Sequence, residues 1–260
     1  MFVVNSFWYG SPITTIGELC IESFIKNGFE FHLWSYDMNI KVPNGCIVKD
    51  ANEILDESLI FRLTQGNAKG SVAPFSDWFR FKLLYEQGGT WVDMDMVCLQ
   101  PFEIQPNSIC GEEDGKISMV IISLEKGHPM AKEMVDCYTN PCVEKPYDTF
   151  SRLNKKKELS SLPLQRQREQ MPWGFLGNDV LNLIYKNYNF NVLSTHDFYP
   201  IKCEKFYEIF LGNNDLNILG DAKCIHLWGE IIRFVKLKID KNYNKNTLFG
   251  KLLDKFLPFR

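Results

Sequence analysis

The chain has 260 residues, of which 45% are hydrophobic and 14% aromatic, so it can bury one large core. Its net charge of -3 and pI near 5.9 argue against a nucleic-acid partner, because no excess of Lys and Arg is present to neutralise phosphates. The eight cysteines are scattered and form no CxxC pair, which indicates free thiols in a reducing compartment.

The start of the chain, Phe2-Val3-Val4, lacks the basic segment and cleavage site of a signal peptide. The longest apolar run, residues 119–124, is far too short to span a bilayer. We therefore expect a cytoplasmic protein that can also sit peripherally on the inner face of the cell membrane.

In the first third of the chain, strand patterns alternate with a helix pattern. Strands are predicted at residues 2–5, 30–34 and 46–48, and a helix at 15–26 that ends at Asn27-Gly28. This alternation predicts an α/β fold with mainly parallel strands, in which ligands bind at the carboxyl ends of the strands.

The most strongly patterned stretch is residues 75–102. Apolar residues recur there with helical spacing until Gly88-Gly89 ends the helix, and Thr90-Trp91-Val92 then reads as a buried strand that leads into Asp93 and Asp95. Further strands are predicted at residues 108–111 and 118–124, and further helices at 129–138 and 177–188.

Two segments are rich in basic residues. Residues 151–170 contain few apolar side chains, which predicts a mobile surface segment. Residues 233–260 are basic and place Leu248, Phe249, Leu252 and Phe256 on one helical face, which predicts an amphipathic tail. Such a tail can contact an anionic membrane or pack on the core.

Asp93 and Asp95 form an Asp-Met-Asp pair. Two carboxylates at positions i and i+2 of an extended strand end point to the same side and can bind one hard cation, Mn²⁺ or Mg²⁺. Alone, this pair is more often a solvated turn, but here it follows an apolar strand and is flanked by Met94 and Met96. On the preceding helix, Asp77 and Arg80 share a face, either as a surface ion pair or as ligands of a donor sugar.

The string Ser76-Asp77-Trp78-Phe79-Arg80 through Gly88-Gly89-Thr90-Trp91 to Asp93-Met94-Asp95 resembles the sugar-binding DXD region of glycosyltransferase family 32 and its relatives. These include bacterial capsule and O-antigen transferases and glucosylating toxin domains. The one departure is Trp91, where the family commonly has Tyr.

The resemblance extends toward both ends of the chain. Phe7-Trp8-Tyr9-Gly10 is similar to the family's W-x-G element, which implies that Trp8, with Tyr9 and Gly10 beside it, binds the nucleobase. His226-Leu227-Trp228 is similar to the family's H-x-W, which implies that His226 is a metal ligand together with Asp93 and Asp95. Without the resemblance, Trp8 and His226 would each be read as an ordinary core or surface side chain.

The Gly177-Asn178-Asp179 segment sits where related enzymes place side chains beneath the anomeric carbon. This similarity implies a catalytic role for Asn178 or Asp179, although a helix cap explains either residue equally well. The acidic triplet Glu112-Glu113-Asp114 is a solvated turn or part of an acceptor rim.

The resemblance implies a glycosyltransferase A type fold, which is a single Rossmann-like domain with a mixed, mainly parallel sheet. We expect a catalytic domain over residues 1–232, with nucleotide-sugar binding in 1–110 and the acceptor side in 111–232, followed by the tail at 233–260. The implied activity is retaining, metal-dependent transfer of a hexose or N-acetylhexosamine from a UDP-sugar, bound by Trp8, Tyr9, Gly10, Asp77, Arg80, Asp93, Met94 and Asp95. The implied acceptor is a glycan, lipid-linked, in surface polysaccharide synthesis.

Retention by double displacement would need a carboxylate nucleophile, for which Asp179 is the candidate, whereas a front-face path needs none. Two alternatives to the transferase remain open. Asp93-Met94-Asp95-Met96-Val97 also fits the nucleophilic loop of a haloacid dehalogenase-type phosphatase. A degenerate transferase that acts as a membrane-surface scaffold is the other alternative.

Overall fold

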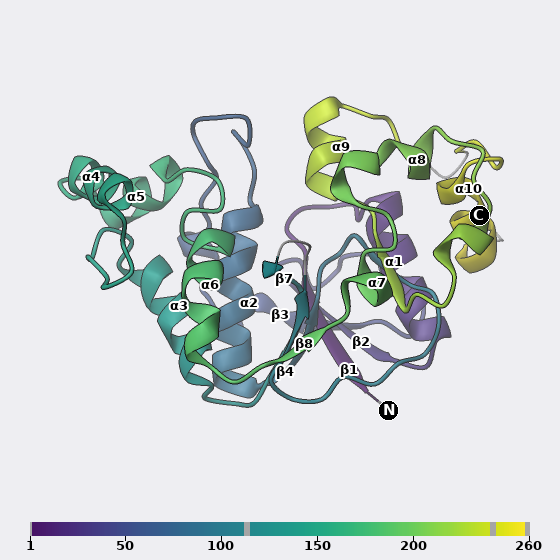
Figure 1. The fold of residues 1–260 in the computed structure, drawn as a ribbon, viewed down its shortest axis with the longest axis horizontal. Helices are drawn as coiled ribbons and strands as arrows, with labels where there is room; N and C mark the ends of the chain where they lie inside the picture. Colours follow the sequence, from purple (N-terminus) through teal and green to yellow (C-terminus); the bar gives the residue numbers. More distant parts are fainter. Residues whose placement is uncertain (1, 112–114, 240–242, 258–260) are drawn as a thin grey trace.

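A seven-stranded sheet runs through the centre of the protein, with helices on both faces (Figure 1). The computed structural model describes residues 2–111, 115–239 and 243–257. Within these ranges, the only antiparallel neighbours in the sheet are those that involve β7. The mixed, mainly parallel sheet predicted from the sequence is confirmed. In spatial order the strands are β3 (Ile47–Asp50), β2 (Glu30–Ser35), β1 (Val3–Phe7), β4 (Gly89–Val92), β7 (Ile117–Leu124), β6 (Ser108–Gly111) and β8 (Asn191–Leu193).

Strands β1 and β4 are parallel neighbours at the centre of this sheet. Val4 pairs with Thr90 and Asn5 with Trp91, so the segments that follow the two strands leave the sheet at the same edge. Those segments carry Trp8 and Asp93. The topology therefore places two separate sequence motifs side by side.

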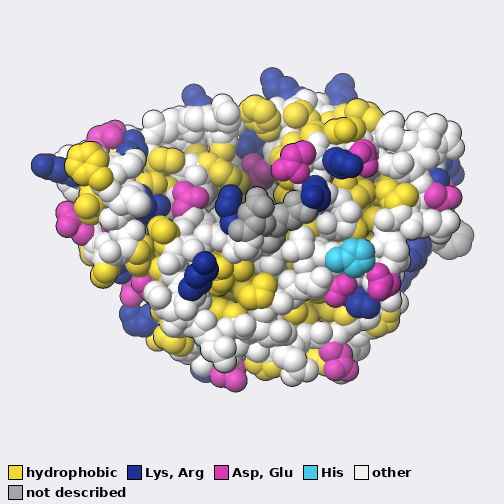
Figure 2. All heavy atoms as spheres, viewed as in Figure 1, with side chains coloured by type: hydrophobic (Ala, Val, Ile, Leu, Met, Phe, Trp, Pro, Cys, Tyr) yellow, Lys and Arg dark blue, Asp and Glu magenta, His cyan; other side chains and the backbone are white. Residues whose placement is uncertain are grey.

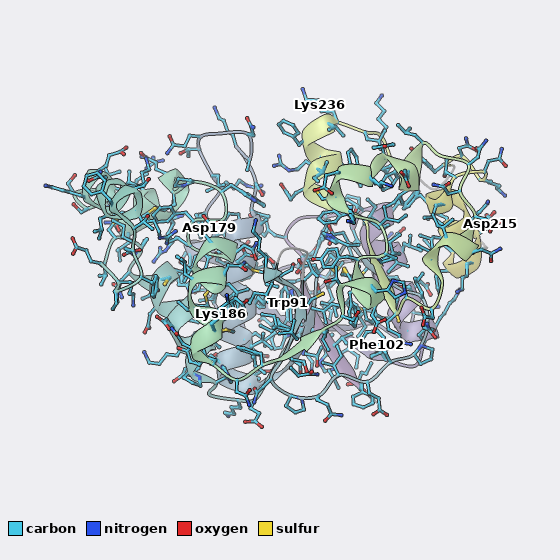
Figure 3. All side chains as sticks on the ribbon, viewed as in Figure 1. Trp91, Phe102, Asp179, Lys186, Asp215 and Lys236 are labelled. Atoms are coloured by element: carbon cyan, nitrogen blue, oxygen red, sulfur yellow. The ribbon has the colours of Figure 1, made fainter. Side chains whose placement is uncertain are left out.

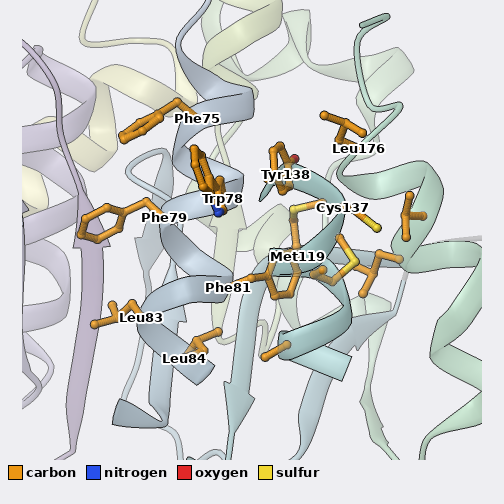
Figure 4. Close-up of a cluster of buried hydrophobic side chains, with 14 of the residues drawn as sticks. Phe75, Trp78, Phe79, Phe81, Leu83, Leu84, Met119, Cys137, Tyr138 and Leu176 are labelled. Carbon is orange, nitrogen blue, oxygen red and sulfur yellow. The ribbon is translucent and has the colours of Figure 1, made fainter. Parts of the chain in front are cut away.

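Successive residues of a strand face opposite sides, and in β4 this alternation divides the core in two. Trp91 packs in the cluster formed with α2, α3 and α6, of which Figure 4 shows a part, whereas Val92 packs in the cluster formed with α1. The longer helices are α1 (Thr15–Lys26), α2 (Ala73–Gln87), α3 (Pro129–Thr139), α4 (Phe150–Leu159), α5 (Leu164–Gln170), α6 (Asn178–Ile184), α9 (Gly229–Val235) and α10 (Leu248–Phe256), with the short α7 (Thr195–Phe198) and α8 (Tyr207–Phe210). Single turns of 3₁₀-helix lie at Ala51–Glu53, Glu57–Leu59, Tyr185–Asn187, Cys203–Lys205 and Leu216–Leu219.

Helix α2 ends where the sequence predicts, at Gly88. This residue has φ 73°, and a Cβ there would lie 2.7 Å from the backbone nitrogen of Lys126. Glycine is required on both counts, because other residues avoid this conformation and would collide with the neighbouring chain. The sharp turn directs the chain straight into β4 and thus fixes where Asp93 emerges.

A second, two-stranded sheet joins the middle of the chain to its last quarter. Strand β5 (Met96–Cys98) pairs antiparallel with β9 (Cys224–His226), and Met96 is opposite His226. The pairing sets the end of β9 beside the Asp93–Asp95 segment.

The prediction that residues 151–170 are a mobile surface segment is wrong. The segment forms α4 and α5, and Arg152, Lys156 and Arg168 are buried. Arg152 and Lys156 both contact Asp148, while Arg168 donates to the carbonyl of Tyr138 at 2.7 Å. Composition alone missed this because the partners lie outside the segment.

The C-terminal tail does form an amphipathic helix, α10, but its apolar face is turned inward. Leu248, Phe249 and Leu252 are fully buried, and α10 contacts α1 and α8. Lys26 of α1 donates to the carbonyl of Phe256 at 2.7 Å. The expectation that this face contacts a membrane does not hold for α10, because the protein itself covers it.

Among the described residues, no helix is long and apolar enough to cross a membrane. The eight cysteines, all of which lie in the described ranges, form no disulfide. The acidic triplet Glu112-Glu113-Asp114 lies outside the described residues.

Candidate active site

Asp93 and Asp95 lie on a tight turn between β4 and β5. The N–H of Met96 donates to the carbonyl of Asp93 at 3.0 Å, and the N–H of Asp93 donates to the carbonyl of Val120 at 2.8 Å. The expectation of an extended strand end is therefore wrong, because the chain must leave the main sheet here to enter the second one. This turn, and not strand alternation, sets the directions of the two carboxylates.

Arg80 lies at the centre of the site and is almost fully buried. Its Nη2 lies 3.1 Å from Asp77 Oδ1 and 2.7 Å from Asp93 Oδ1, and its Nη1 donates to the carbonyl of Met119 at 2.6 Å. The guanidinium also lies over the ring of Trp91, 4.9 Å from its centroid, and the Trp91 indole N–H donates to Asp93 Oδ1 at 2.7 Å. Asp77 and Arg80 do form an ion pair, but a buried one that extends to Asp93.

One cation thus faces two carboxylates, and the pKa values reflect this imbalance. Burial raises the pKa of Asp77 to about 6, although Arg80 opposes the shift. The pKa of Asp93 is also raised, by burial first and by the charge of Asp95, again against Arg80. Buried carboxylates in a surplus over their cations are typical of sites that bind a further positive group.

Asp95 faces away from Arg80, toward His226 on β9. Asp95 Oδ2 lies 3.1 Å from His226 Nε2 and accepts the N–H of Gly229 at 2.7 Å. Burial would raise the pKa of Asp95, but His226 and these hydrogen bonds lower it. This pair supplies a carboxylate oxygen and an imidazole nitrogen, two ligand types that could hold Mg²⁺ or Mn²⁺.

The third predicted metal ligand, Asp93, is placed differently. Its Oδ1 atom is already taken by Arg80 and Trp91. Among the described residues, no group of three His, Cys, Asp or Glu side chains is arranged to hold a metal ion. The structure therefore brings Asp95 and His226 together as a pair, and the full set with Asp93 stays a prediction.

The residues predicted to bind the nucleobase follow β1. The Trp8 N–H donates to the carbonyl of Trp34 at 2.9 Å, and its indole nitrogen is buried with no hydrogen-bond partner. Tyr9 packs edge-on against Tyr36, and the Arg62 guanidinium lies over the Tyr9 ring at 5.4 Å. Trp8 and Tyr9 lie at the same sheet edge as Asp93.

Gly10 and Met94 complete the predicted donor-binding set. Gly10 has φ 103° and open space where a side chain would be. The Met94 side chain packs toward α1, where its terminal methyl would lie 3.1 Å from a Cβ on Gly17. Met94 thus anchors the turn against α1 with its side chain.

The start of α6 closes the opposite side of the site. A Cβ on Gly177 would lie 2.7 Å from Asp77 Oδ2, so the backbone of Gly177 lies against the Asp77 carboxylate. The Oδ1 atom of Asn178 is buried with no partner. Asp179 is exposed and lies near Gly174, which leaves Gly177 and not Asp179 against Asp77.

Two tyrosines in the site were not predicted. Tyr138 of α3 directs its hydroxyl at Asp77 Oδ2, at 3.5 Å. The ring of Tyr199 lies edge-on to His226 with centroids 5.4 Å apart, and its hydroxyl donates to Ser118 at 2.6 Å. In the sequence Tyr138 continues the apolar face of a helix and Tyr199 follows no motif, so neither carried a functional signal.

Residues 18–116 match the family model of the glycosyltransferase sugar-binding region containing DXD motif. The chain is a glycosyltransferase with a DXD sugar-binding region. The matched span contains Asp77, Arg80, Asp93 and Asp95, the four residues of the ion-pair network and its turn. The resemblance and the enzyme class predicted from the sequence are confirmed.

Solved structures of two glycosyltransferases are similar to this one. The PaToxG glycosyltransferase has a TM-score of 0.45 and 15% sequence identity, with 71% of this chain and 68% of that chain covered. The ligand-free glycosyltransferase domain from the YGT toxin has a TM-score of 0.46 and 10% identity, with 99% and 97% covered. No curated protein matches the chain significantly.

The transferase assignment removes the phosphatase alternative. A phosphatase of that kind would use Asp93 as an attacking nucleophile, but Asp93 Oδ1 is bound by Arg80 and by the Trp91 indole. β4 is also not the first strand of the fold. Asp93 lies instead within the span that matches the sugar-binding region.

Proposed function

We propose that the enzyme transfers a hexose or N-acetylhexosamine from a UDP-sugar to a glycan acceptor, with retention of anomeric configuration and with Mn²⁺ or Mg²⁺. The single observation that carries the proposal is the contact of Asp95 with His226 at 3.1 Å, beside a buried network in which two carboxylates share Arg80. Oxygen and imidazole ligands at that spacing, next to surplus negative charge, favour a divalent cation.

Asp95 and His226 would hold the ion from two different strands, with Asp93 beside them. A divalent cation in this place supplies charge neutralisation of the diphosphate as it leaves the sugar. Gly229 donates its N–H to Asp95 Oδ2 and so fixes the carboxylate toward the ion position. Tyr199 limits the rotation of the His226 ring through edge-on packing.

Asp77 and Arg80 would bind the donor sugar. Asp77 accepts hydrogen bonds from sugar hydroxyls, and Arg80 orients Asp77 and Asp93 at fixed distances so that no reorganisation is needed when the donor binds. Trp8, with Tyr9 beside it, would hold the nucleobase at the neighbouring end of β1. Asn178 Oδ1, which is buried without a partner, offers one more acceptor near Asp77.

Retention in this site would follow the front-face path. The carboxylate that sequence reasoning offered as a nucleophile, Asp179, is exposed and turned toward Gly174. Asp77 is held by Arg80 and by the Tyr138 hydroxyl. In the front-face path the acceptor hydroxyl attacks from the side of the departing diphosphate, whose oxygen takes the proton, and the protein positions the groups and screens charge.

A lipid-linked acceptor in surface polysaccharide synthesis is the setting that we propose for this reaction. Helix α9, not α10, offers the supporting surface: Phe234 is 55% exposed and Val235 48% exposed. Lys236 and Lys238 follow them, and basic and hydrophobic side chains appear along the upper edge of the molecule over α9 (Figure 2). Exposed apolar residues flanked by cations favour contact with anionic lipid.

The test is to incubate the protein and Mn²⁺ with UDP-glucose, UDP-galactose, their N-acetylhexosamine counterparts and GDP-mannose, and to measure released nucleotide. We expect slow hydrolysis of at least one UDP-sugar, lost on addition of EDTA and restored by Mn²⁺. If the protein neither binds nor turns over any of these donors, the proposed function is contradicted.

A further inference from the structure

A cavity opens between α4 and α6, outside the proposed donor site. It encloses about 510 Å³, which is within the range of about 300–1,000 Å³ typical of ligand pockets. Its lining comes from the first turns of α4, the loop before α6 and α6 itself, and includes Ser151, Arg152, Lys155, Phe175, Asp179 and Leu183. No step of the donor chemistry uses these side chains.

The cavity adjoins the sugar end of the donor site. Gly177 touches Asp77 through the close approach described above, and Asp179, two residues further along, lines the cavity. Figure 3 shows Asp179 on α6, on the side of the molecule opposite the tip of α9 at Lys236. A ligand in the cavity would therefore lie near Asp77, next to the proposed position of the donor sugar.

The charges of the cavity select the class of ligand. Arg152 already has partners within the protein: its Nε donates to Asp148 at 3.0 Å, and its Nη2 donates to the carbonyl of Phe175 at 2.8 Å. Lys155 is paired with Glu158 at 3.0 Å. With its cations engaged and an exposed carboxylate at Asp179, the cavity disfavours phosphate and other anions.

The other lining groups of the cavity suit a neutral sugar. The Asp179 carboxylate can accept two hydroxyl hydrogen bonds, and the Ser151 and Thr149 hydroxyls can both donate and accept. The Arg152 guanidinium covers the Phe175 ring at 3.8 Å from ring centroid to Cζ, and Leu183, which is 41% exposed, adds an apolar wall. Carboxylate and hydroxyl groups beside the apolar wall at Leu183 match the hydroxyl-bearing edge and C–H face of a hexose.

We propose that this cavity binds a neutral hexose or N-acetylhexosamine unit of the acceptor glycan, with Asp179 accepting hydrogen bonds from its hydroxyls. The inference rests on the proposed function, since it places the acceptor of that same transfer. It also gives Asp179 a role as a binding residue for the acceptor in place of the nucleophile considered from the sequence.

The test titrates the full ¹⁵N-labelled chain with methyl α-D-glucopyranoside, methyl α-D-galactopyranoside and methyl N-acetyl-α-D-glucosaminide, and follows the amide signals. We expect at least one glycoside to shift amides within residues 149–155 and 172–183. Asp179→Ala should weaken this binding at least tenfold. Leu183→Trp, which fills the cavity with a larger side chain, should weaken it to the same extent and is the variant to use if Asp179→Ala folds poorly. Glu204→Ala, an exposed acidic residue elsewhere, should leave binding within twofold.

The inference is overturned if none of the glycosides binds, if the shifts lie elsewhere, or if inorganic phosphate binds the cavity in their place. A parallel titration with UDP and Mg²⁺ separates this failure from failure of the proposed function. A chain that binds UDP with Mg²⁺ but no glycoside contradicts the acceptor site alone. A chain that binds a glycoside but no UDP contradicts the donor chemistry, and with it the acceptor role of the cavity.

Discussion

Two charge clusters in this protein have opposite ratios of cations to carboxylates. Around Arg80, one cation is shared by the carboxylates of Asp77 and Asp93 at 3.1 and 2.7 Å. Around Asp148, one carboxylate is shared by Arg152 and Lys156 at 3.0 and 2.5 Å. The first cluster carries surplus negative charge and the second surplus positive charge.

The two clusters differ in how that surplus is met. In the Asp148 cluster, the remaining N–H groups of the two cations donate to backbone carbonyls. Arg152 donates to the carbonyl of Phe175 at 2.8 Å, and Lys156 donates to the carbonyl of Val143 at 2.8 Å. In the Arg80 cluster, burial instead raises the pKa of Asp77 to about 6. A cluster whose surplus charge is satisfied internally stabilises the fold, whereas one whose surplus charge is left over is a candidate ligand-binding site.

The largest effect should come from removing the acid that faces His226. Asp95→Ala should lower nucleotide release at least about 10²- to 10³-fold with the fold retained, because charge stabilisation at the leaving group is lost. The matched control is Asp221→Ala, since Asp221 also pairs with a histidine, His196, at 3.0 Å but on the exposed surface. Equal loss in both variants, measured by initial rates and circular dichroism, would contradict the assigned site.

The next largest effect is on stability and concerns the Asp148 cluster. Asp148→Asn leaves two buried cations without a counter-charge and should lower the free energy of unfolding by about 3 kcal/mol or more. Burial alone would raise the pKa of Asp148, but Lys156, the Lys145 N–H and Arg152 lower it, so this stabilisation is present above the ordinary pKa and lost as pH falls through the folded value. Urea unfolding at pH 7 measures the change, and a variant as stable as the wild type would rule out a structural role.

A smaller effect follows from ligand binding. Mn²⁺ with UDP, at one hundred times the dissociation constant, should stabilise the wild type by about 2.7 kcal/mol. His226→Ala should lose most of this gain, and His196→Ala, its exposed counterpart, should keep it. Thermal unfolding with and without Mn²⁺ and UDP measures the difference, and an undiminished gain in His226→Ala would remove that residue from the metal site.

Much of the fold could be predicted from short-range patterns. The helix at Thr15–Lys26 and the strand at Ser108–Gly111 match the prediction residue for residue, because caps, glycines and apolar periodicity are local signals. The stretch from Asp77 to Val92 was predicted for the same reason: one helix, one glycine turn and one strand set its geometry, whereas the tight turn with Asp93 and Asp95 was not predicted.

The features that sequence reasoning missed depend on long-range pairing. Strand β5 was not predicted, since it forms only against β9, which is more than a hundred residues away in the sequence. The buried Arg152 and Lys156 looked like surface residues because Asp148 and the carbonyl of Val143 lie outside the basic segment. The sequence offered Asn178 or Asp179 as the catalytic candidate, but the backbone turn before α6, which composition does not reveal, places Gly177 against Asp77.

The smallest effect is the pH dependence of stability that Asp77 contributes. It is also the most direct test of the difference between the Arg80 and Asp148 clusters. The folded pKa of Asp77, about 6, exceeds the ordinary value of 3.8, so between these values the folded state binds more protons than the unfolded state, and stability falls as pH rises. Asp77→Asn removes this loss. Relative to the wild type without metal, the variant should therefore gain about 2 kcal/mol between pH 4 and pH 7.

Urea unfolding in EDTA across that range measures the gain, and Asp148→Asn should show no such gain because the pKa of its carboxyl is shifted the other way. Stabilised or not, Asp77→Asn should bind donor more weakly, because an amide accepts hydroxyl hydrogen bonds less strongly than a carboxylate. A variant that is destabilised at pH 7 would mean that Arg80 needs both carboxylates for folding, and the Arg80 cluster would then be structural in the same sense as the Asp148 cluster.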